Sequence, residues 1–280
     1  MISSFRGIGL APGWGSERAD ALARPAGLRL ALCCGILGLA LGLGLHASPW
    51  DRPLLLALHQ GRPGPEALWL FLTQLGDSAL VGLVLLALAG ADGARRALVL
   101  KTWLLGAVLS PLLKNLINSP RPLAVLEPGL LQVIGQPPSG WHSMPSGHSL
   151  AAAALVGVLG LFWAPRRPWL WVPLALLALA IGCSRVAVGA HWPGDVLAGL
   201  GLGTLVVVVA QTWERHRPWA RPLASRRADV AVRVLQALLV FALWRQPQEG
   251  LAMTLASAAA VLLALLCAWT GPGLRERTDG

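Results

Sequence analysis

The chain has 280 residues, of which 55% are hydrophobic and 13% are charged, and its formal net charge is +10. This composition is too apolar for an ordinary soluble domain and indicates an integral membrane protein. The basic residues stand between apolar runs, so they indicate membrane orientation and contact with anionic lipids at the cytoplasmic face, with no nucleic-acid partner. Continuous runs of Leu, Ala and Val without alternation favour an all-α transmembrane bundle over an outer-membrane barrel.

The apolar runs predict eight membrane spans, because a hydrocarbon core of roughly 30 Å requires about 20 apolar residues per helix. The predicted spans are residues 27–46, 68–91, 97–113, 148–164, 169–187, 195–211, 229–244 and 251–269. Basic segments follow every second span. The positive-inside rule therefore predicts that both termini are cytoplasmic. The expected location is a bacterial-type inner membrane.

Four segments are predicted along the chain: an N-terminal cytoplasmic tail at 1–25, a six-span core at 26–212, a basic cytoplasmic linker at 213–228, and a transmembrane hairpin with a tail at 229–280. The first span is expected to remain uncleaved. The cysteines lie in apolar runs without C-x-x-C spacing, which predicts buried, inert thiols and neither zinc nor disulfides. They are Cys33, Cys34, Cys183 and Cys267.

Three polar clusters lie at span ends that the predicted topology places on the outer face. "KNLINSPRP" (114–122) ends the third span, "PSGH" (145–148) begins the fourth, and "SRVAVGAHWPGD" (184–195) joins the fifth to the sixth. Helices that alternate in direction bring these three ends to one membrane face. One Lys, two Arg and two His would then converge, which suits a phosphate or another tetrahedral oxyanion.

The cationic residues and the helix start have complementary tasks in such a site. Arg121 and Arg185 offer planar forks of donors, and Lys114 adds a point charge. Free N–H groups at the start of the "PSGH" helix can hold an anion. Gly147 lets the backbone approach the ligand, and the Ser146 hydroxyl can add a hydrogen bond.

His191 and Asp195 are four residues apart near a helix start, so they share one helical face. A carboxylate there can fix the tautomer of the imidazole, which makes His191 a competent nucleophile. His148 is then available as the general acid that protonates the leaving oxygen.

The spacings K-x6-R-P, P-S-G-H and S-R-x5-H-x3-D resemble the three-part signature of the type 2 phosphatidic acid phosphatase family, over about residues 66–212. The resemblance implies a six-helix membrane core and phosphate transfer to His191, which Asp195 orients, while His148 acts on the leaving group. It implies no metal and no other cofactor. The positions that match the family's phosphate binders are Lys114, Arg121, Ser146, Gly147 and Arg185. The two extra C-terminal spans depart from the family pattern.

The expected function is hydrolysis of a lipid phosphate or diphosphate at the outer face of this inner membrane. The sequence does not distinguish phosphatidic acid, phosphatidylglycerophosphate and undecaprenyl diphosphate as substrates, nor does it indicate an oligomeric state. A lipid phosphotransferase with the same phosphohistidine is the nearest alternative, and a transporter with buried charges is another. Asp77 is expected to cap a helix or to have another structural role, with lining of the substrate entrance as the alternative. His46, His59 and His216 are interpreted as incidental.

Overall fold

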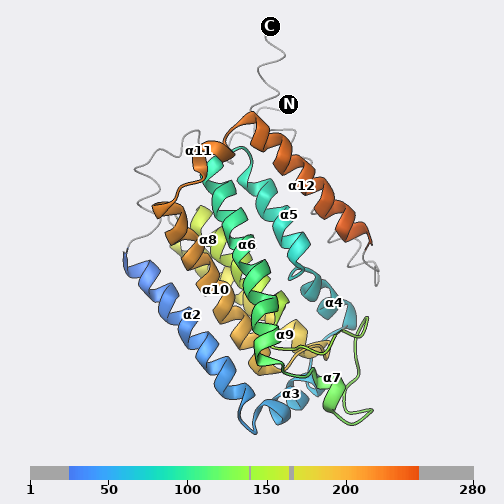
Figure 1. Cartoon of the computed structure of the whole chain (residues 1–280). Helices are drawn as coiled ribbons and strands as arrows, with labels where there is room; N and C mark the ends of the chain where they lie inside the picture. The colour runs from blue at the N-terminus through green and yellow to red at the C-terminus, as the bar shows by residue number, and fades with distance from the viewer. Residues whose placement is uncertain (1–24, 139, 164–166, 246–280) are drawn as a thin grey trace.

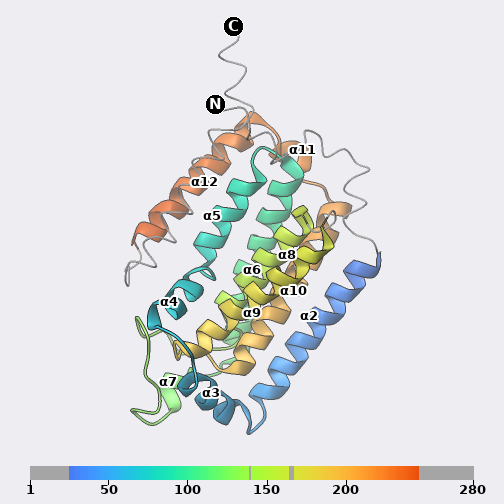
Figure 2. The same cartoon turned by 180° about the vertical axis from the view of Figure 1, so that it is seen from behind.

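The computed structural model describes residues 25–138, 140–163 and 167–245, which form a bundle of helices without a strand in those ranges (Figures 1 and 2). The longer helices are α2 (Pro25–His46), α5 (Ser78–Ala89), α6 (Gly93–Ile117), α8 (Gly147–Trp163), α9 (Trp171–Ala187), α10 (Pro193–His216) and α12 (Arg226–Arg245). The shorter ones are α3 (Asp51–Gln60), α4 (Glu66–Gln74), α7 (Pro122–Val125), the 3-10 turn η1 (Pro168–Leu170) and α11 (Ala220–Leu223). The all-α prediction is confirmed.

Four helices in the described ranges, namely α2, α6, α9 joined to η1, and α10, are long and apolar enough to cross a membrane. The predicted span 68–91 is a pair of helices, α4 and α5, bent by 58°, and it makes a fifth span if the pair is counted as one. The α8 helix is apolar but has only 17 residues. The α12 helix contains the predicted span 229–244 but is not among these candidate spans. It carries five charged residues: Arg226, Arg227, Asp229, Arg233 and Arg245. The predicted span 251–269 lies outside the described residues.

The bend between α4 and α5 occurs where Asp77 begins a new helix. Its Oδ1 accepts the backbone N–H groups of Ala79 at 2.8 Å and Leu80 at 3.0 Å. A carboxylate in this position satisfies donors that have no partner within the helix and interacts favourably with the helix dipole. The sequence interpretation of Asp77 as a cap is confirmed, and the cap stabilises a helix start in the middle of an apolar run.

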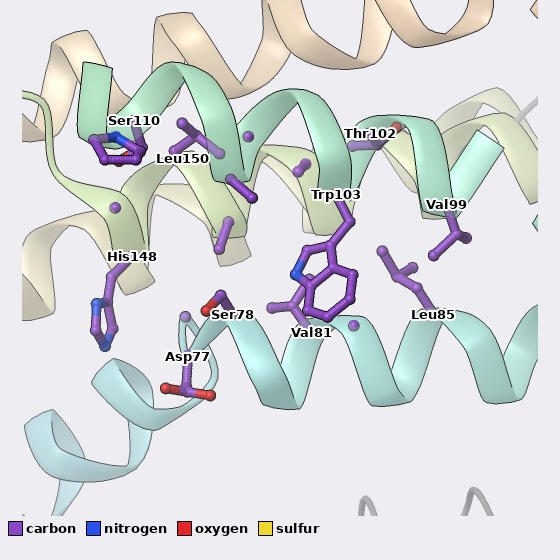
Figure 3. A pocket seen from close by; sticks show the side chains of 18 residues that line it. Asp77, Ser78, Val81, Leu85, Val99, Thr102, Trp103, Ser110, His148 and Leu150 are labelled. Carbon is purple, nitrogen blue, oxygen red and sulfur yellow. The ribbon is translucent and has the colours of Figure 1, made fainter. Parts of the chain in front are cut away.

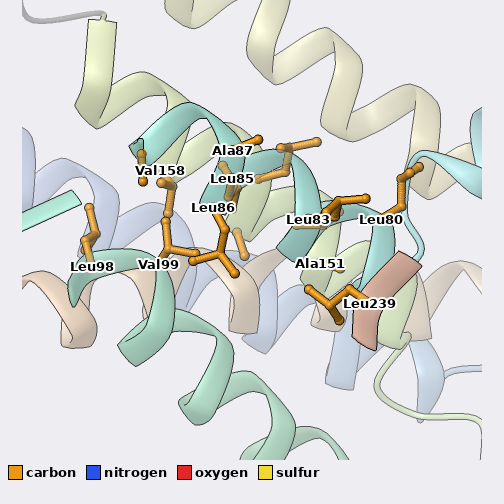
Figure 4. Close-up of a cluster of buried hydrophobic side chains, with 14 of the residues drawn as sticks. Leu80, Leu83, Leu85, Leu86, Ala87, Leu98, Val99, Ala151, Val158 and Leu239 are labelled. Atoms are coloured by element: carbon orange, nitrogen blue, oxygen red, sulfur yellow. The ribbon is translucent and has the colours of Figure 1, made fainter. Parts of the chain in front are cut away.

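The main hydrophobic core lies between α5, α6 and α8, and α12 covers it from one side (Figure 4). Leu83, Leu86, Val99 and Val158 are buried there, and Leu239 extends from α12 into the same cluster. An ion pair fixes α12 at its start: Arg96 Nη2 donates to Asp229 Oδ1 at 2.6 Å. Thus the described part of the predicted C-terminal hairpin packs directly on the helices of the core.

Helices α2 and α10 approach each other closely through small residues. A Cβ at Gly42 would lie 2.3 Å from the backbone nitrogen of Ala198, and a Cβ at Gly201 would lie 2.3 Å from that of Leu39. Both distances are far below van der Waals contact, so only glycine fits at these two positions. Such small-residue packing is typical of membrane helices. It holds the end of α2 against the start of α10.

The prediction of buried thiols is wrong for the three cysteines in the described part of the chain. Cys33 and Cys34 on α2 and Cys183 on α9 are exposed. In a membrane helix, an apolar run covers the lipid-facing surface as well as the packed surface, so hydropathy does not separate the two. Cys267 lies outside the described residues.

Candidate active site

The three sequence clusters meet at the end of the bundle that also carries α3 and α7 (Figure 1). Lys114 lies in the last turn of α6, and His148 lies in the first turn of α8. Arg185 lies in the last turn of α9, and the short connection from α9 to α10 carries His191. Electrostatic interactions join His148 to Arg185, His191, Lys114 and Arg121. The predicted convergence of these side chains is therefore present in the fold.

His191 and Asp195 form a buried pair, with exposed fractions of 2% and 0%. The Nδ1 atom of His191 lies 3.1 Å from Asp195 Oδ2. Because a carboxylate accepts hydrogen bonds, this contact places the ring proton on Nδ1. The same Oδ2 atom accepts the backbone N–H of Trp192 at 2.9 Å and the hydroxyl of Ser143. Three donors thus hold one carboxylate oxygen in place.

The other ring nitrogen of His191 faces a guanidinium group. Arg121 Nη1 lies 3.4 Å from His191 Nε2, and because a guanidinium only donates, Nε2 presents its lone pair. Arg121 is held by two backbone carbonyls, through Nη1 to Ala190 at 3.0 Å and through Nε to Gly140 at 3.1 Å. The cation is therefore fixed beside the lone pair of the imidazole.

The environment of His191 favours the neutral imidazole. Burial lowers the pKa of His191 well below its ordinary value, and the positive charges of Arg185, Arg121 and Lys114 lower it further. Both causes act against a second proton on the ring. A neutral imidazole with its proton on Nδ1 has a nucleophilic Nε2.

Three cations, Lys114, Arg121 and Arg185, interact electrostatically with His191. The Lys114 ammonium interacts electrostatically with Arg121 and Arg185. Arg185 donates through Nη1 to the hydroxyl of Thr73, while its buried Nε makes no hydrogen bond within the described part of the protein. Like charges at close range repel in a partly buried site, and a bound anion would remove that repulsion. The arrangement therefore suits an oxyanion.

The start of α8 contributes backbone donors next to these cations. Ser146 is fully buried, and its Oγ accepts hydrogen bonds from the backbone N–H of Ser149 at 3.3 Å and from its hydroxyl at 3.0 Å. These bonds use the acceptor capacity of Ser146, and its own O–H remains as a donor. A Cβ at Gly147 would meet nothing closer than Ser110 Oγ at 3.8 Å. Ser146 therefore caps the start of α8, and there is free space beside Gly147.

A cavity of about 360 Å³ opens beside His148 and lies between α5, α6 and α8 (Figure 3). Asp77, Ser78, Ser110 and His148 gather at one end of the cavity. The walls beyond are mainly apolar side chains, including Val81, Leu85, Val99, Trp103 and Ala154. The polar end thus lies beside His148, and the apolar part extends into the bundle.

Four polar residues around the site were not identified from the sequence. Ser143 is fully buried between the two partners of the pair, with Oγ 3.2 Å from His191 Nδ1. His46, Asp51 and Ser119 form a further set of contacts behind Asp195. The interpretation of His46 as incidental is therefore wrong. Ser143 precedes "PSGH" by only two residues, and this closeness is the signal that could have indicated it.

His59 was also interpreted as incidental, and the structure shows it buried. Its Nδ1 lies 3.2 Å from the carbonyl of Val186, and its Nε2 accepts the backbone N–H of Gln132 at 3.1 Å. Burial lowers its pKa, which favours the neutral ring that these contacts require. His59 therefore ties the loop after α7 to the end of α9. His216 is exposed at the other end of α10.

No group of three or more His, Cys, Asp or Glu side chains in the described ranges is arranged to hold a metal ion.

Fold and geometry together define a helical membrane protein with a buried histidine–carboxylate pair beside three cations. The model of the PAP2 superfamily matches residues 96–219 of this chain. This confirms the resemblance to the type 2 phosphatidic acid phosphatases that the three motifs indicated.

Curated relatives are similar to part of the chain. An undecaprenyl-diphosphatase from Sulfolobus acidocaldarius is 32% identical over 42% of this chain and 54% of its own length. A lipid A 1-phosphatase from Rhizobium etli is 34% identical over 38% of this chain and 45% of its own length. The chain therefore spans about half the length of these relatives.

A crystal structure shares the fold. The transmembrane PAP2-type phosphatidylglycerolphosphate phosphatase from Bacillus subtilis superposes with a TM-score of 0.51 and is 23% identical. The superposition covers 67% of this chain and 96% of that one. The similarity shows that the bundle described above has the same fold as that membrane phosphatase.

Proposed function

We propose that this protein is an integral membrane phosphatase that removes phosphate from a lipid phosphate or diphosphate through a phosphohistidine at His191. The observation that carries the proposal is the lone pair of His191 Nε2 facing Arg121, with Asp195 held on Nδ1. Similarity to an undecaprenyl-diphosphatase and to a lipid A 1-phosphatase supports a phosphorylated lipid as the substrate class.

In the first step, Nε2 of His191 attacks phosphorus in line with the bond to the lipid oxygen. An N–P bond forms, the O–P bond breaks, and His148 protonates the departing lipid oxygen. Lys114, Arg121 and Arg185 neutralise the charge on the equatorial oxygens, with Ser146 and the backbone at Gly147 as further donors. Asp195 keeps the proton of His191 on Nδ1 and stabilises the positive ring that forms.

In the second step, water attacks the phosphohistidine and His148 accepts a proton from that water. The N–P bond breaks, inorganic phosphate leaves, and His191 regains its lone pair. We propose that this cycle needs no metal ion, because the three cationic side chains supply the positive charge that a metal would otherwise provide.

The lipid part of the substrate is proposed to occupy the cavity beside His148. A phosphate at His191 would place the attached chain near the polar end formed by Asp77, Ser110 and His148 (Figure 3). The apolar walls beyond suit a hydrocarbon chain, because they bury its surface without leaving a polar group unsatisfied.

We propose a location in the inner, or plasma, membrane of a bacterial-type cell, with the site on the outer face. Basic residues at the opposite end of the bundle support this orientation, in agreement with the positive-inside rule. They include Arg95, Arg96, Arg215, Arg217 and Arg221. Anionic lipids at the cytoplasmic face would contact this end.

The test is phosphate release by purified His191→Ala protein from phosphatidic acid, phosphatidylglycerophosphate, undecaprenyl diphosphate and a lipid A phosphate. The wild-type protein should release phosphate from at least one of them, and His191→Ala should abolish that release. His216→Ala is the matched control, because His216 is exposed at the far end of α10. Near-normal turnover by His191→Ala would contradict the mechanism. Labelled phosphate appearing in another lipid instead of in solution would indicate a phosphotransferase.

A further inference from the structure

A second histidine–aspartate pair lies behind the pair of His191 and Asp195. His46 ends α2 and Asp51 begins α3, and neither lies within the residues that match the PAP2 superfamily. His46 Nδ1 lies 3.0 Å from Asp51 Oδ2. Because a carboxylate accepts, this contact places a ring proton on Nδ1 of His46.

The same nitrogen of His46 also approaches Asp195. The distance from His46 Nδ1 to Asp195 Oδ1 is 3.7 Å. Asp195 Oδ1 is buried and makes no hydrogen bond within the described residues, whereas Oδ2 is held by Ser143 and Trp192. A buried carboxylate oxygen without a partner costs free energy. The His46 N–H therefore lies on the side of Asp195 that lacks a hydrogen bond.

Asp51 brings a second carboxylate to the start of α10, close to Asp195. Its Oδ1 accepts the backbone N–H of Gly194 at 2.8 Å, in the first turn of α10. Asp195 occupies the same first turn and accepts the backbone N–H of Trp192. Both carboxylates benefit from the positive end of the helix, but they also repel each other. His46 lies between them and offers the same N–H to both.

The second ring nitrogen of His46 is linked to Asp195 through hydrogen bonds of Ser119 and Ser143. Its Nε2 lies 2.8 Å from Ser119 Oγ, and the carbonyl of Ser119 accepts the backbone N–H of Ser143 at 2.8 Å. Ser143 in turn donates to Asp195. Glycine packing between α2 and α10 holds the end of α2 in this place.

We propose that His46, supported by Asp51, is a positioning residue that holds the Asp195 carboxylate in the orientation that His191 requires. The inference rests on the proposed phosphatase function and extends its machinery to α2 and α3. His46 acts through the donor at Nδ1, because that atom faces both carboxylates, while the contact of Nε2 with Ser119 is secondary.

The test compares three substitutions that remove or retain each ring nitrogen. His46→Ala removes both, His46→Asn keeps an N–H donor near the position of Nδ1, and His46→Gln keeps a polar atom near the position of Nε2. We expect kcat to fall about tenfold in His46→Ala and His46→Gln, since the hydrogen bond of Nδ1 to Asp51 and the charge-assisted approach of the same N–H to Asp195 Oδ1 are both lost. His46→Asn should restore kcat to within about threefold of wild type. KM should be unchanged throughout, because His46 does not contact the phosphate binders.

Phosphate release is measured in detergent with the lipid that wild-type protein hydrolyses best, and His216→Ala is the control. Wild-type kcat in His46→Ala would overturn the inference. Equal loss in His46→Asn and His46→Ala would also overturn it, because a merely structural role does not depend on the donor at Nδ1. If His46→Ala fails to fold, the kcat values of His46→Asn and His46→Gln are compared instead, and an equal loss of kcat in both would overturn the inference. A wild-type protein without phosphatase activity would refute the proposed function and this inference with it, and that result is seen before any variant is compared.

Discussion

Ser143 donates a hydrogen bond through its hydroxyl to Oδ2 of Asp195, the same oxygen that faces the ring of His191. The Ser143 side chain is fully buried, and its backbone N–H is fixed by the carbonyl of Ser119. Hydrogen bonds therefore hold both the side chain and the backbone of Ser143. Its hydrogen bond helps to hold the Asp195 oxygen that accepts the Nδ1 proton of His191.

We expect Ser143→Ala to lower kcat about tenfold, because the carboxylate loses one of its three donors and gains freedom to rotate. KM should change little, since Ser143 is not among the proposed phosphate binders. Steady-state kinetics of the purified variant measure both quantities. Ser225→Ala is the matched control, because Ser225 is an exposed serine at the far end of the bundle. An unchanged kcat in Ser143→Ala would show that the hydrogen bond does not position Asp195.

With His191 as the proposed nucleophile, its pKa is expected to set the acid limit of activity. Burial and the cations of Arg185, Arg121 and Lys114 lower this pKa below the ordinary 6.5, so the ring stays neutral as the pH falls through that value. Protonation of Nε2 removes the nucleophile, and the acid limb of kcat/KM reports this group in the free enzyme. We therefore expect the limb to lie below pH 6.5.

The substrate phosphate also titrates near pH 6, so the acid limb needs a control. Lys114→Gln removes one of the charges that lower the pKa of His191. This variant should move the limb toward neutral pH, while the ionisation of the substrate stays the same. A limb above 6.5 in the wild-type protein, or no displacement in Lys114→Gln, would contradict the assignment of the limb to His191.

Much of the site geometry was predictable because it depends on helix ends. Lys114, His148 and Arg185 each lie within a turn of the end of an apolar helix, and alternating helix directions bring such ends together. The spacing of four residues between His191 and Asp195 also predicted a local contact, which the structure shows. These relationships follow from periodicity and topology, which are readable from the chain.

The contribution of α2 and α3 was not predictable from spacing. His46 meets Ser119 from 73 positions away in the chain, and Asp51 meets Gly194 from 143 positions away. Gly35, Gly38 and Gly42 mark a close-packing face on α2, but such a face does not say which helix it will contact. Only the tertiary fold places His46 beside Asp195.

A chelator should leave the rate of phosphate release intact. The proposed charge stabilisation comes from Lys114, Arg121 and Arg185, and none of these side chains depends on a metal for its charge. The measurement is phosphate release after prolonged dialysis against EDTA, followed by a second assay with added Mg²⁺. Loss of activity on dialysis together with recovery on Mg²⁺ addition would contradict the metal-independent mechanism.

The cavity beside His148 predicts selectivity for the lipid part of the substrate. Val81 is buried and lines the apolar portion of the cavity (Figure 3). Val81→Trp should fill much of the 360 Å³ and lower kcat/KM for long-chain lipid phosphates at least about tenfold, since the chain then loses buried apolar contact. A short, water-soluble phosphate ester does not need this space, so its hydrolysis should change little.

Val209→Trp is the matched control for Val81→Trp, because Val209 is 50% exposed on α10 and does not line the cavity. It adds the same side chain to the outer surface of the bundle. Equal losses for long-chain and short-chain substrates in Val81→Trp would indicate a damaged site instead of a blocked cavity. Unchanged kinetics with long-chain lipids would mean that the hydrocarbon chain leaves the site by another path. A selective loss confined to Val81→Trp is the expected result, because only that substitution removes the space in which the chain would be buried.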